Sequence, residues 1–303
     1  MSWPWKLSFT CRTLARWTWD WALDGLRPRR RPIHVLFCMT DHYEPGTGGV
    51  GPQREDARVR ELLAKYPPLA DRHRDAAGRP LQRTWFIPPH YHRRGHLKNI
   101  VGLCERGYGE IELHLHHGKT RPDTAQYLEA TIRLCLDEYS VFGIFGNEDG
   151  RRRYGFIHGD WALDNSRGGR FCGVDSEIAI LRRTGCYADF TFPSMNEANP
   201  ALINAIYYAT DDPARPKSHN RGARAAAGRP PSGDLLMVEG PLHPLWIKPG
   251  PLGLRMRGDA IDGCPPSTAA RMDQWVRTAI HVRGRRDWVV IKTHTHGAID
   301  AAV

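Results

Sequence analysis

The chain has 303 residues and a formal net charge of +10, and its hydrophobic content of 41% is ordinary for a globular protein. This length suits one large α/β domain or two small ones. The sequence shows neither an apolar run of transmembrane length nor a signal-peptide pattern, so we expect neither an integral membrane protein nor a secreted one.

The positive charge comes largely from arginine, as in residues 27–31 and 151–153. Such a balance favours acidic partners, namely anionic polysaccharide, lipid headgroups or nucleic acid, although a solvated basic surface explains it as simply. Nucleic-acid binding has no support beyond the charge, because we find no recognisable motif, and we do not expect it. Seven cysteines without a Cys-x-x-Cys pair indicate reduced thiols and a cytoplasmic location.

Residues 1–32 are rich in tryptophan and arginine and differ from the rest of the chain. Leu14, Trp17 and Trp21 have helical spacing, which predicts an amphipathic helix. Such a helix docks on the protein's own core, which we favour, or makes a peripheral contact with a membrane. We therefore expect an N-terminal helical arm followed by one domain over residues 33–303.

Strand and helix patterns alternate after the arm. Residues 33–39 form a nearly continuous apolar run, typical of a strand buried on both faces of a parallel sheet. Alternating strands and helices favour a mostly parallel sheet or barrel, and about seven strand signals make the barrel the preferred interpretation. The other predicted strands are residues 83–87, 110–116, 154–158, 187–192, 235–239 and 288–292.

Helices are predicted between these strands. The first is interrupted by Pro67-Pro68, the third has Asp123 as its N-cap, and the last turns Met272, Trp275, Val276 and Ile280 inward. Residues 212–234 are rich in Gly, Pro, Arg and Ala and predict a long mobile loop. The predicted helices are residues 54–74, 97–106, 123–139, 175–184 and 268–282.

The strand at residues 110–116 carries the strongest chemical signal. Its apolar residues share one face, while Glu110, Glu112, His114 and His116 share the other, and His117 follows directly. Clustered histidines beside acidic residues at a strand end are candidate metal ligands, because neutral imidazole is a common nitrogen donor to zinc. The alternative is a solvated strand edge with incidental histidines.

Other polar clusters also follow predicted strands. A barrel would gather Asp41-His42, Asp160-Trp161 and the pair His294 and His296 at the same rim as the histidine strand. Each cluster has a simpler structural explanation, such as a turn cap for Asp41-His42 or a structural loop for Asp160-Trp161. The histidines predicted to lie mostly on the surface are His90, His92 and His96, and His219 is placed in the mobile loop.

These motifs, taken as an ordered set, resemble the polysaccharide deacetylase superfamily of metal-dependent carbohydrate esterases. Thr40-Asp41-His42 is similar to the family's Asp-Asp pair after the first strand, with His42 replacing the second Asp. Gly109 followed by residues 110–114 keeps the spacing that leads into the family's histidine pair, and residues 289–294 match its last strand and catalytic histidine. The resemblance covers roughly residues 33–297. The family's Arg motif is not visible, and its Asp-Trp motif is absent unless Asp189 serves.

The resemblance implies a distorted (β/α)7-type barrel that hydrolyses N- or O-linked acetyl groups on a polysaccharide or sugar. Because only six residues follow Gly297, we expect the barrel's final helix to be missing. Asp41 would be the general base or itself a metal ligand, and His294 would be the general acid, with His296 on the same strand face. The implied zinc-like divalent ion would be held by His42, His114 and either His116 or His117, and Asp160 and Trp161 would contact the sugar, with Trp85 as a second stacking candidate.

Two other classes of function stay open. His294-x-His296 is also a ligand pattern of metal-dependent phosphoesterases and amidohydrolases, although their pair usually opens the barrel. An inactive barrel that binds a metal and a glycan would carry the same residues.

Overall fold

The computed structural model describes residues 3–26, 32–91, 93–148, 150–246, 253–262 and 268–299. The arginine run at residues 27–31, His92 and the last residues, 300–303, lie outside these ranges, as do the predictions made for them.

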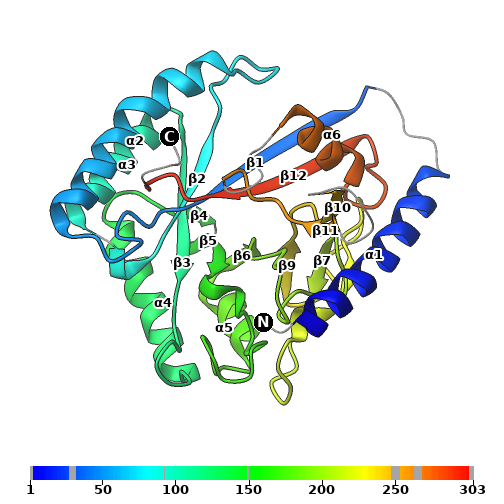
Figure 1. Cartoon of the computed structure of the whole chain (residues 1–303). Helices are drawn as coiled ribbons and strands as arrows, with labels where there is room; N and C mark the ends of the chain where they lie inside the picture. Colours follow the sequence, from blue (N-terminus) through cyan, green and yellow to red (C-terminus); the bar gives the residue numbers. More distant parts are fainter. Residues whose placement is uncertain are drawn as a thin grey trace.

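Ten strands of the described ranges form a curled sheet at the centre of this α/β fold (Figure 1). Seven strands are parallel neighbours, and they are the seven predicted from the sequence. Their carboxyl ends therefore lie at the same edge of the sheet. In spatial order the seven are β12 (Trp288–Thr295), β1 (His34–His42), β2 (Arg83–Ile87), β3 (Gly109–Leu115), β5 (Arg151–His158), β6 (Cys186–Asp189) and β9 (Leu235–Val238).

Short strands that the sequence did not predict extend this parallel part. They are antiparallel to their neighbours, so they give the sheet its mixed character. Strands β7 (Ile206–Ala209) and β8 (Ala223–Arg224) continue the sheet beyond β9, and β4 (Gly146–Glu148) pairs with β5. A separate hairpin consists of β10 (His243–Trp246) and β11 (Leu254–Arg257).

Helices cover the convex side of the sheet (Figure 1). The main core lies between helices and strands, where Leu62, Ile100 and Leu128 from three helices pack in one cluster with Trp85 and Leu113. The other face of β1 and β3 carries polar side chains toward the carboxyl ends of these strands, among them His42 and His114. The helices are α2 (Pro52–Arg72), α3 (Arg94–Glu105), α4 (Ala125–Ser140), α5 (Glu177–Thr184) and α6 (Ala269–Thr278), and short 3-10 turns occur at η1 (Pro89–Tyr91), η2 (Gly159–Trp161) and η3 (Ser218–Asn220).

The structure corrects two predictions about burial and helix continuity. The first half of β1 is exposed, with Val35 and Leu36 at 48% and 39%, because β2 pairs with β1 only from Thr40 onward. Helix α2 runs through Pro67-Pro68 without a break. Proline inside a helix costs about 3 kcal/mol, and burial of this face of α2, including Tyr66, offsets that cost.

Details of two other helices also differ from the predictions. The N-cap of α4 is Thr124, whose hydroxyl accepts the Tyr127 amide, while the Asp123 carboxylate contacts His117 instead. Helix α6 buries Trp275 but leaves Met272 exposed at 45%, so the predicted inward face is narrower than expected. Ile280 is buried beyond the end of the helix.

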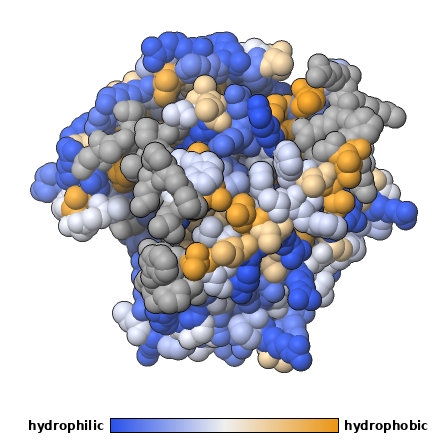
Figure 2. Space-filling view, turned by 45° about the vertical axis from the view of Figure 1, so that its right-hand side comes forward, coloured by the Kyte–Doolittle hydropathy of each residue, from blue (hydrophilic) through white to orange (hydrophobic). Residues whose placement is uncertain are grey.

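The N-terminal arm is a helix, α1 (Trp3–Gly25), that docks on the protein's own core. Phe9 is buried against Ile203, Leu242 and Met256, and Leu14 and Trp17 pack at the edge of this cluster. The surface around α1 includes apolar residues among hydrophilic ones (Figure 2). Among the described helices, none combines the length and the apolar character needed to cross a bilayer.

The segment predicted as a long mobile loop contains ordered elements. It includes η3 and β8, and it buries His219 completely. The His219 ring stacks on Phe192 with centroids 4.7 Å apart, and its Nε2 bonds the carbonyl of Ala198. His219 is therefore a packed core histidine.

Candidate metal centre

Histidines from three strands converge at the carboxyl edge of the sheet. In the register of the parallel strands, Thr40 of β1 lies opposite His294 of β12. The His42 ring lies 4.9 Å from the ring of His114, 5.0 Å from that of His296 and 5.6 Å from that of His294, measured between centroids. The structure thus brings together side chains that are more than 200 residues apart in sequence.

Glu44 joins two of the predicted ligands, His114 and His116. Glu44 Oε1 lies 3.1 Å from His114 Nε2 and 2.6 Å from His116 Nε2. The three donor atoms are close enough together to share one metal ion. Two imidazoles and one carboxylate, with a further position left open, form the ligand set of many catalytic zinc sites. The sequence had suggested His42, His114 and either His116 or His117 as ligands, whereas the group found here is Glu44, His114 and His116.

The outer nitrogens of both imidazoles are held by hydrogen bonds. His114 Nδ1 donates to the carbonyl of Ile157 at 2.9 Å, and His116 Nδ1 lies 2.8 Å from Asp160 Oδ2. These bonds turn the Nε2 atoms toward Glu44, which is how outer partners usually orient metal-binding histidines. Gly159 allows His116 to lie here, because a Cβ on this glycine would be 2.3 Å from His116 Nδ1.

The charge states at the centre suit a cation. Burial disfavours the Glu44 carboxylate, but hydrogen bonds from His114 and His116 outweigh it and lower the pKa of Glu44. Burial lowers the pKa of His114, and burial together with neighbouring imidazoles holds the pKa of His42 well below its ordinary value. For His116, Asp160 and Glu44 outweigh burial and raise the pKa, so a bound metal has to displace a proton there.

His294 of β12 and His296, which follows the end of this strand, are each paired with an aspartate. His294 Nδ1 lies 2.7 Å from Asp259 Oδ1, and the other oxygen of Asp259 lies 2.6 Å from Lys292 Nζ. Burial opposes ionisation of Asp259, but Lys292 and His294 lower its pKa to about 2. His296 Nδ1 lies 3.0 Å from Asp262 Oδ2, which also accepts the His296 amide. Burial disfavours the His296 imidazolium, yet Asp262 raises the pKa of His296.

Asp41 lies on the opposite face of β1 from these histidines. Successive residues of a strand point to opposite sides, and Asp41 is opposite Trp85, a residue of the helix-side core. Its Oδ2 is 2.9 Å from Arg83 Nη1, and its Oδ1 accepts the Gly297 amide at 2.9 Å. Both side chains of the Asp41–Arg83 pair are buried. The structure therefore does not join Asp41 to the metal histidines, and its oxygens are already occupied.

The remaining predicted residues fall in different places. His117 points away from His116 and contacts Asp123 and Glu177. Asp160 bonds His116, while Trp161 is partly buried and packs against the main core. Trp85 is completely buried, which excludes the predicted stacking on a sugar ring.

Sequence reasoning missed several residues of this region. Asp259 and Asp262 lie in a loop after β11, without a periodic pattern to place them near β12. Arg83 did give a signal, because a charged residue opens an otherwise apolar strand, two positions before Trp85 on the same face. The residues missed as site partners are Arg83, Asp259, Asp262 and Lys292.

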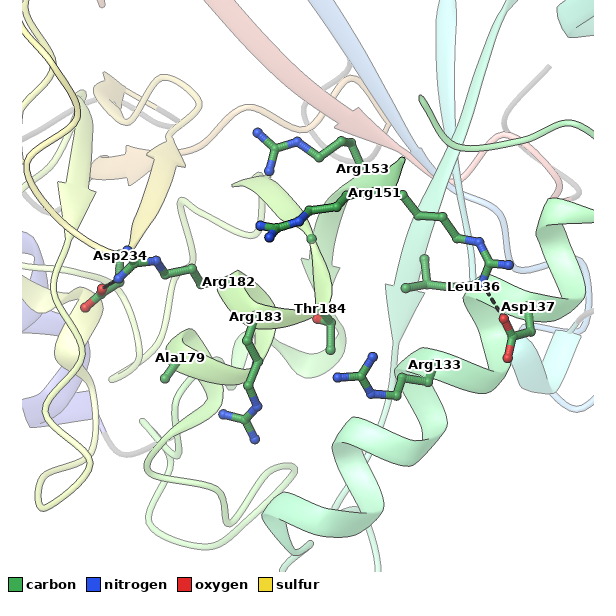
Figure 3. Close-up of a pocket in the computed structure, with 12 residues that line it drawn as sticks. Arg133, Leu136, Asp137, Arg151, Arg153, Ala179, Arg182, Arg183, Thr184 and Asp234 are labelled. Atoms are coloured by element: carbon green, nitrogen blue, oxygen red, sulfur yellow. Dashed lines mark hydrogen bonds and ion pairs between the residues drawn. The ribbon is translucent and has the colours of Figure 1, made fainter. Parts of the chain in front are cut away.

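A cavity of about 880 Å³ lies between α4, α5 and the start of β5, away from the histidines (Figure 3). Arg152 is paired with Asp137 and Arg182 with Asp234, so carboxylates neutralise part of its positive charge. The cavity offers positive charge for an anion, but none of the described residues that line it is a histidine. It lies at the start of β5, whereas His158 lies at the other end of this strand. Six arginines line it: Arg133, Arg151, Arg152, Arg153, Arg182 and Arg183.

Comparison of the chain with protein-family models, with curated proteins and with solved structures gave no match.

Proposed function

We propose that the chain is a metal-dependent hydrolase whose metal ion is held by Glu44, His114 and His116. The supporting observation is the convergence of one carboxylate oxygen and two imidazole Nε2 atoms, each imidazole oriented by a hydrogen bond at Nδ1. The donor set fits zinc, which prefers nitrogen and oxygen ligands of this kind. When bound, such an ion polarises a carbonyl group and makes water acidic enough to lose a proton near neutral pH.

The chain's own residues supply the proton transfers. Asp259 and Asp262 hold the Nδ1 atoms of His294 and His296, which leaves each Nε2 to exchange a proton with a substrate. Burial disfavours the charged form of His296, but Asp262 outweighs it and raises the pKa, which favours the protonated imidazole and suits it to act as the general acid for the leaving group. In this scheme Asp41 is a positioning residue, since it holds the amide of Gly297 directly after His296.

Acetylated sugars are the substrate class to test first. The motif resemblance to polysaccharide deacetylases supports this choice. So does the curled sheet of seven parallel strands, in which the last strand of the chain pairs with the first, and which we assign to a (β/α)7-type barrel. Hydrolysis of an N- or O-linked acetyl group needs carbonyl polarisation, a water to attack it and an acid for the leaving amine or alcohol. The groups around His42 and Glu44 match these needs.

The position of Asp41 favours a second candidate outside the deacetylase scheme. The family's first aspartate would be the general base, but here Asp41 is buried against Arg83 on the other face of β1. A metal hydrolase of another class, acting on a phosphoester or a cyclic amide, would need only the metal and the two His–Asp pairs.

Elemental analysis and an activity assay test the proposal together. His116→Ala and Glu44→Gln are each expected to lose about one metal ion per chain relative to wild type, whereas the control His34→Ala, an exposed histidine, keeps the wild-type content. Acetate release from acetylated sugars should fall with metal content. If wild-type protein supplied with zinc binds none at this site, the hydrolase proposal is wrong. Metal binding with hydrolysis of a phosphoester and no acetate release would favour the second candidate.

A further inference from the structure

A second group of metal-ligating side chains lies beside the candidate centre. His117 follows β3, His158 ends β5, Cys172 lies in the next loop and Glu177 opens α5. One donor atom from each residue lies within 4.8 Å of the other three. All four residues are buried, with exposed fractions between 0% and 9%. None of them takes part in the hydrolytic scheme.

The distances from the two Glu177 oxygens to the other three donors are close to those of a tetrahedral ion site, and one donor atom from each of the four residues lies within 4.8 Å of the others. Glu177 Oε1 lies 3.2 Å from His117 Nε2 and 3.6 Å from His158 Nε2, and Glu177 Oε2 lies 3.3 Å from Cys172 Sγ. Donors bonded to a tetrahedral zinc ion at 2.0–2.3 Å are separated by about 3.3–3.7 Å. The group therefore needs little rearrangement to surround an ion.

Both histidines are oriented as metal ligands. His117 Nδ1 lies 2.9 Å from Asp123 Oδ2, and His158 Nδ1 donates to the carbonyl of Gly159 at 2.5 Å. The Nε2 atom of each ring then faces the group. His158 Nε2 is buried and has no hydrogen-bond partner among the described residues, since Glu177 Oε1 lies 3.6 Å away. Unpaired buried nitrogens are rare in proteins, and a metal ion in the group would satisfy this one.

The sulfur of Cys172 accepts two backbone hydrogen bonds. The backbone amides of Asn165 and Val174 donate to Sγ at 3.2 and 3.4 Å. A neutral thiol is a weak acceptor, whereas amide donors are common around metal-bound thiolates. Backbone bonds from Phe171 to Gly118 and from Asp123 to Cys172 fix this loop against the end of β3.

We propose that His117, His158, Cys172 and Glu177 bind a structural, zinc-like ion separate from the centre at Glu44. Four protein ligands leave no open position, which is the mark of a structural site rather than a catalytic one. The ion ties β3, β5 and α5 to the loop at residues 159–176. That loop contains Asp160, the partner of His116, so the ion also stabilises the neighbouring centre.

A network of hydrogen bonds without an ion is the competing explanation. In that arrangement Glu177 accepts from His117 and from the Cys172 thiol. It leaves His158 Nε2 unpaired, and it predicts that the group shows no affinity for a metal. The two explanations differ in whether Cys172 forms a metal–sulfur bond.

Cobalt substitution of the whole chain tests the difference. Protein stripped by a chelator is titrated with Co²⁺, and a thiolate-to-cobalt charge-transfer band in the near ultraviolet reports a sulfur ligand. We expect the band in wild type, its loss in Cys172→Ser, and its retention in His116→Ala and in Cys135→Ser, a buried cysteine of α4. Absence of the band in wild type, or its survival in folded Cys172→Ser, would overturn the proposal.

A second measurement covers the case in which Cys172→Ser does not fold. Zinc-loaded wild type is measured by X-ray absorption at the zinc edge, where a sulfur scatterer supports the proposal and nitrogen or oxygen scatterers alone refute it. Neither measurement depends on turnover. A protein that binds this ion but hydrolyses nothing would contradict the proposed function and leave the structural site intact.

Discussion

Removing the Arg83 guanidinium should destabilise the protein strongly, because it leaves the Asp41 carboxylate buried without its cation. The two groups are 2.9 Å apart, with side-chain exposures of 7% for Arg83 and 0% for Asp41. At an effective dielectric constant of 20, opposite charges at this distance attract by about 6 kcal/mol before desolvation is subtracted. Breaking such a pair by removing one partner typically costs about 3–5 kcal/mol.

Protonation of Asp41 sets a ceiling on this cost. In Arg83→Met the folded state keeps a proton on Asp41, which the unfolded chain releases near pH 3.9. Since each pH unit above that value adds about 1.4 kcal/mol, the loss should reach at most about 4 kcal/mol at pH 7 and about 1.5 kcal/mol at pH 5. Burial raises the pKa of Asp41 in wild type as well, so the unfolding free energy of wild type also falls as pH rises, and the difference between the two proteins stays below this ceiling.

Urea unfolding at pH 5 and pH 7 measures the effect. Arg133→Met is the matched control, because its ion pair with Glu129 is exposed and should contribute less than about 1 kcal/mol at either pH. A loss below about 1 kcal/mol in Arg83→Met at pH 7 would refute the reasoning from burial. Asp41→Asn separates the two roles considered for Asp41. If Asp41 is a positioning residue, Asp41→Asn lowers the unfolding free energy. If Asp41 is the general base, Asp41→Asn loses turnover while its unfolding free energy stays unchanged.

Two further predictions concern Glu112 on the polar face of β3 and Gly159, which lies against the His116 ring. Burial raises the pKa of Glu112 to about 8, so the folded state binds a proton that the unfolded chain has already released. The unfolding free energy should therefore fall as pH rises from about 5 to 8, by at most about 1.4 kcal/mol per pH unit. Thermal unfolding against pH should show a shallower slope in Glu112→Gln than in wild type and in the exposed control Glu110→Gln, because buried Asp164 and Asp189, whose pKa values are raised to about 8 and about 7, keep part of it. An equal slope in all three proteins would show that Glu112 does not contribute to it. In Gly159→Ala the new methyl group would overlap the His116 ring, and we expect metal affinity at the candidate centre to fall about 10–100-fold. Calorimetric titration with Zn²⁺ measures this affinity, and the control Gly95→Ala, whose new methyl group meets open space, should bind zinc as tightly as wild type. If Gly159→Ala also binds zinc as tightly as wild type, His116 is not a ligand.

The parallel part of the sheet followed from the sequence because each of its strands is an apolar run between helical patterns. Strands such as β8, with only two residues, have no such periodicity, and their pairing depends on contacts made after the core has formed. The hairpin of β10 and β11 was missed for the same reason. The local sequence pattern therefore predicted the parallel strands that form the core, and it missed the short antiparallel strands.

At the candidate centre, the sequence predicted the types of residue better than the faces of the sheet to which their side chains point. Alternation along a strand says that Asp41 and His42 point to opposite faces, but not which face carries the site. The family resemblance suggested that both act at the centre, whereas the structure turns only His42 toward His114. Asp259 and Asp262 could not be assigned, because only the folded loop brings them to His294 and His296.

The pairing of β1 with β12 affects the order in which the protein folds. Thr40 donates to the carbonyl of Thr293, a contact between residues 253 positions apart, and β1 pairs with β12 along its length. Closing so long a loop is entropically costly, and it can occur only after the chain up to Gly297 has been synthesised. We therefore expect the early strands and helices to form a partly folded intermediate whose β1 edge stays unpaired, and the histidines of β12 to join those of β1 and β3 in a late step.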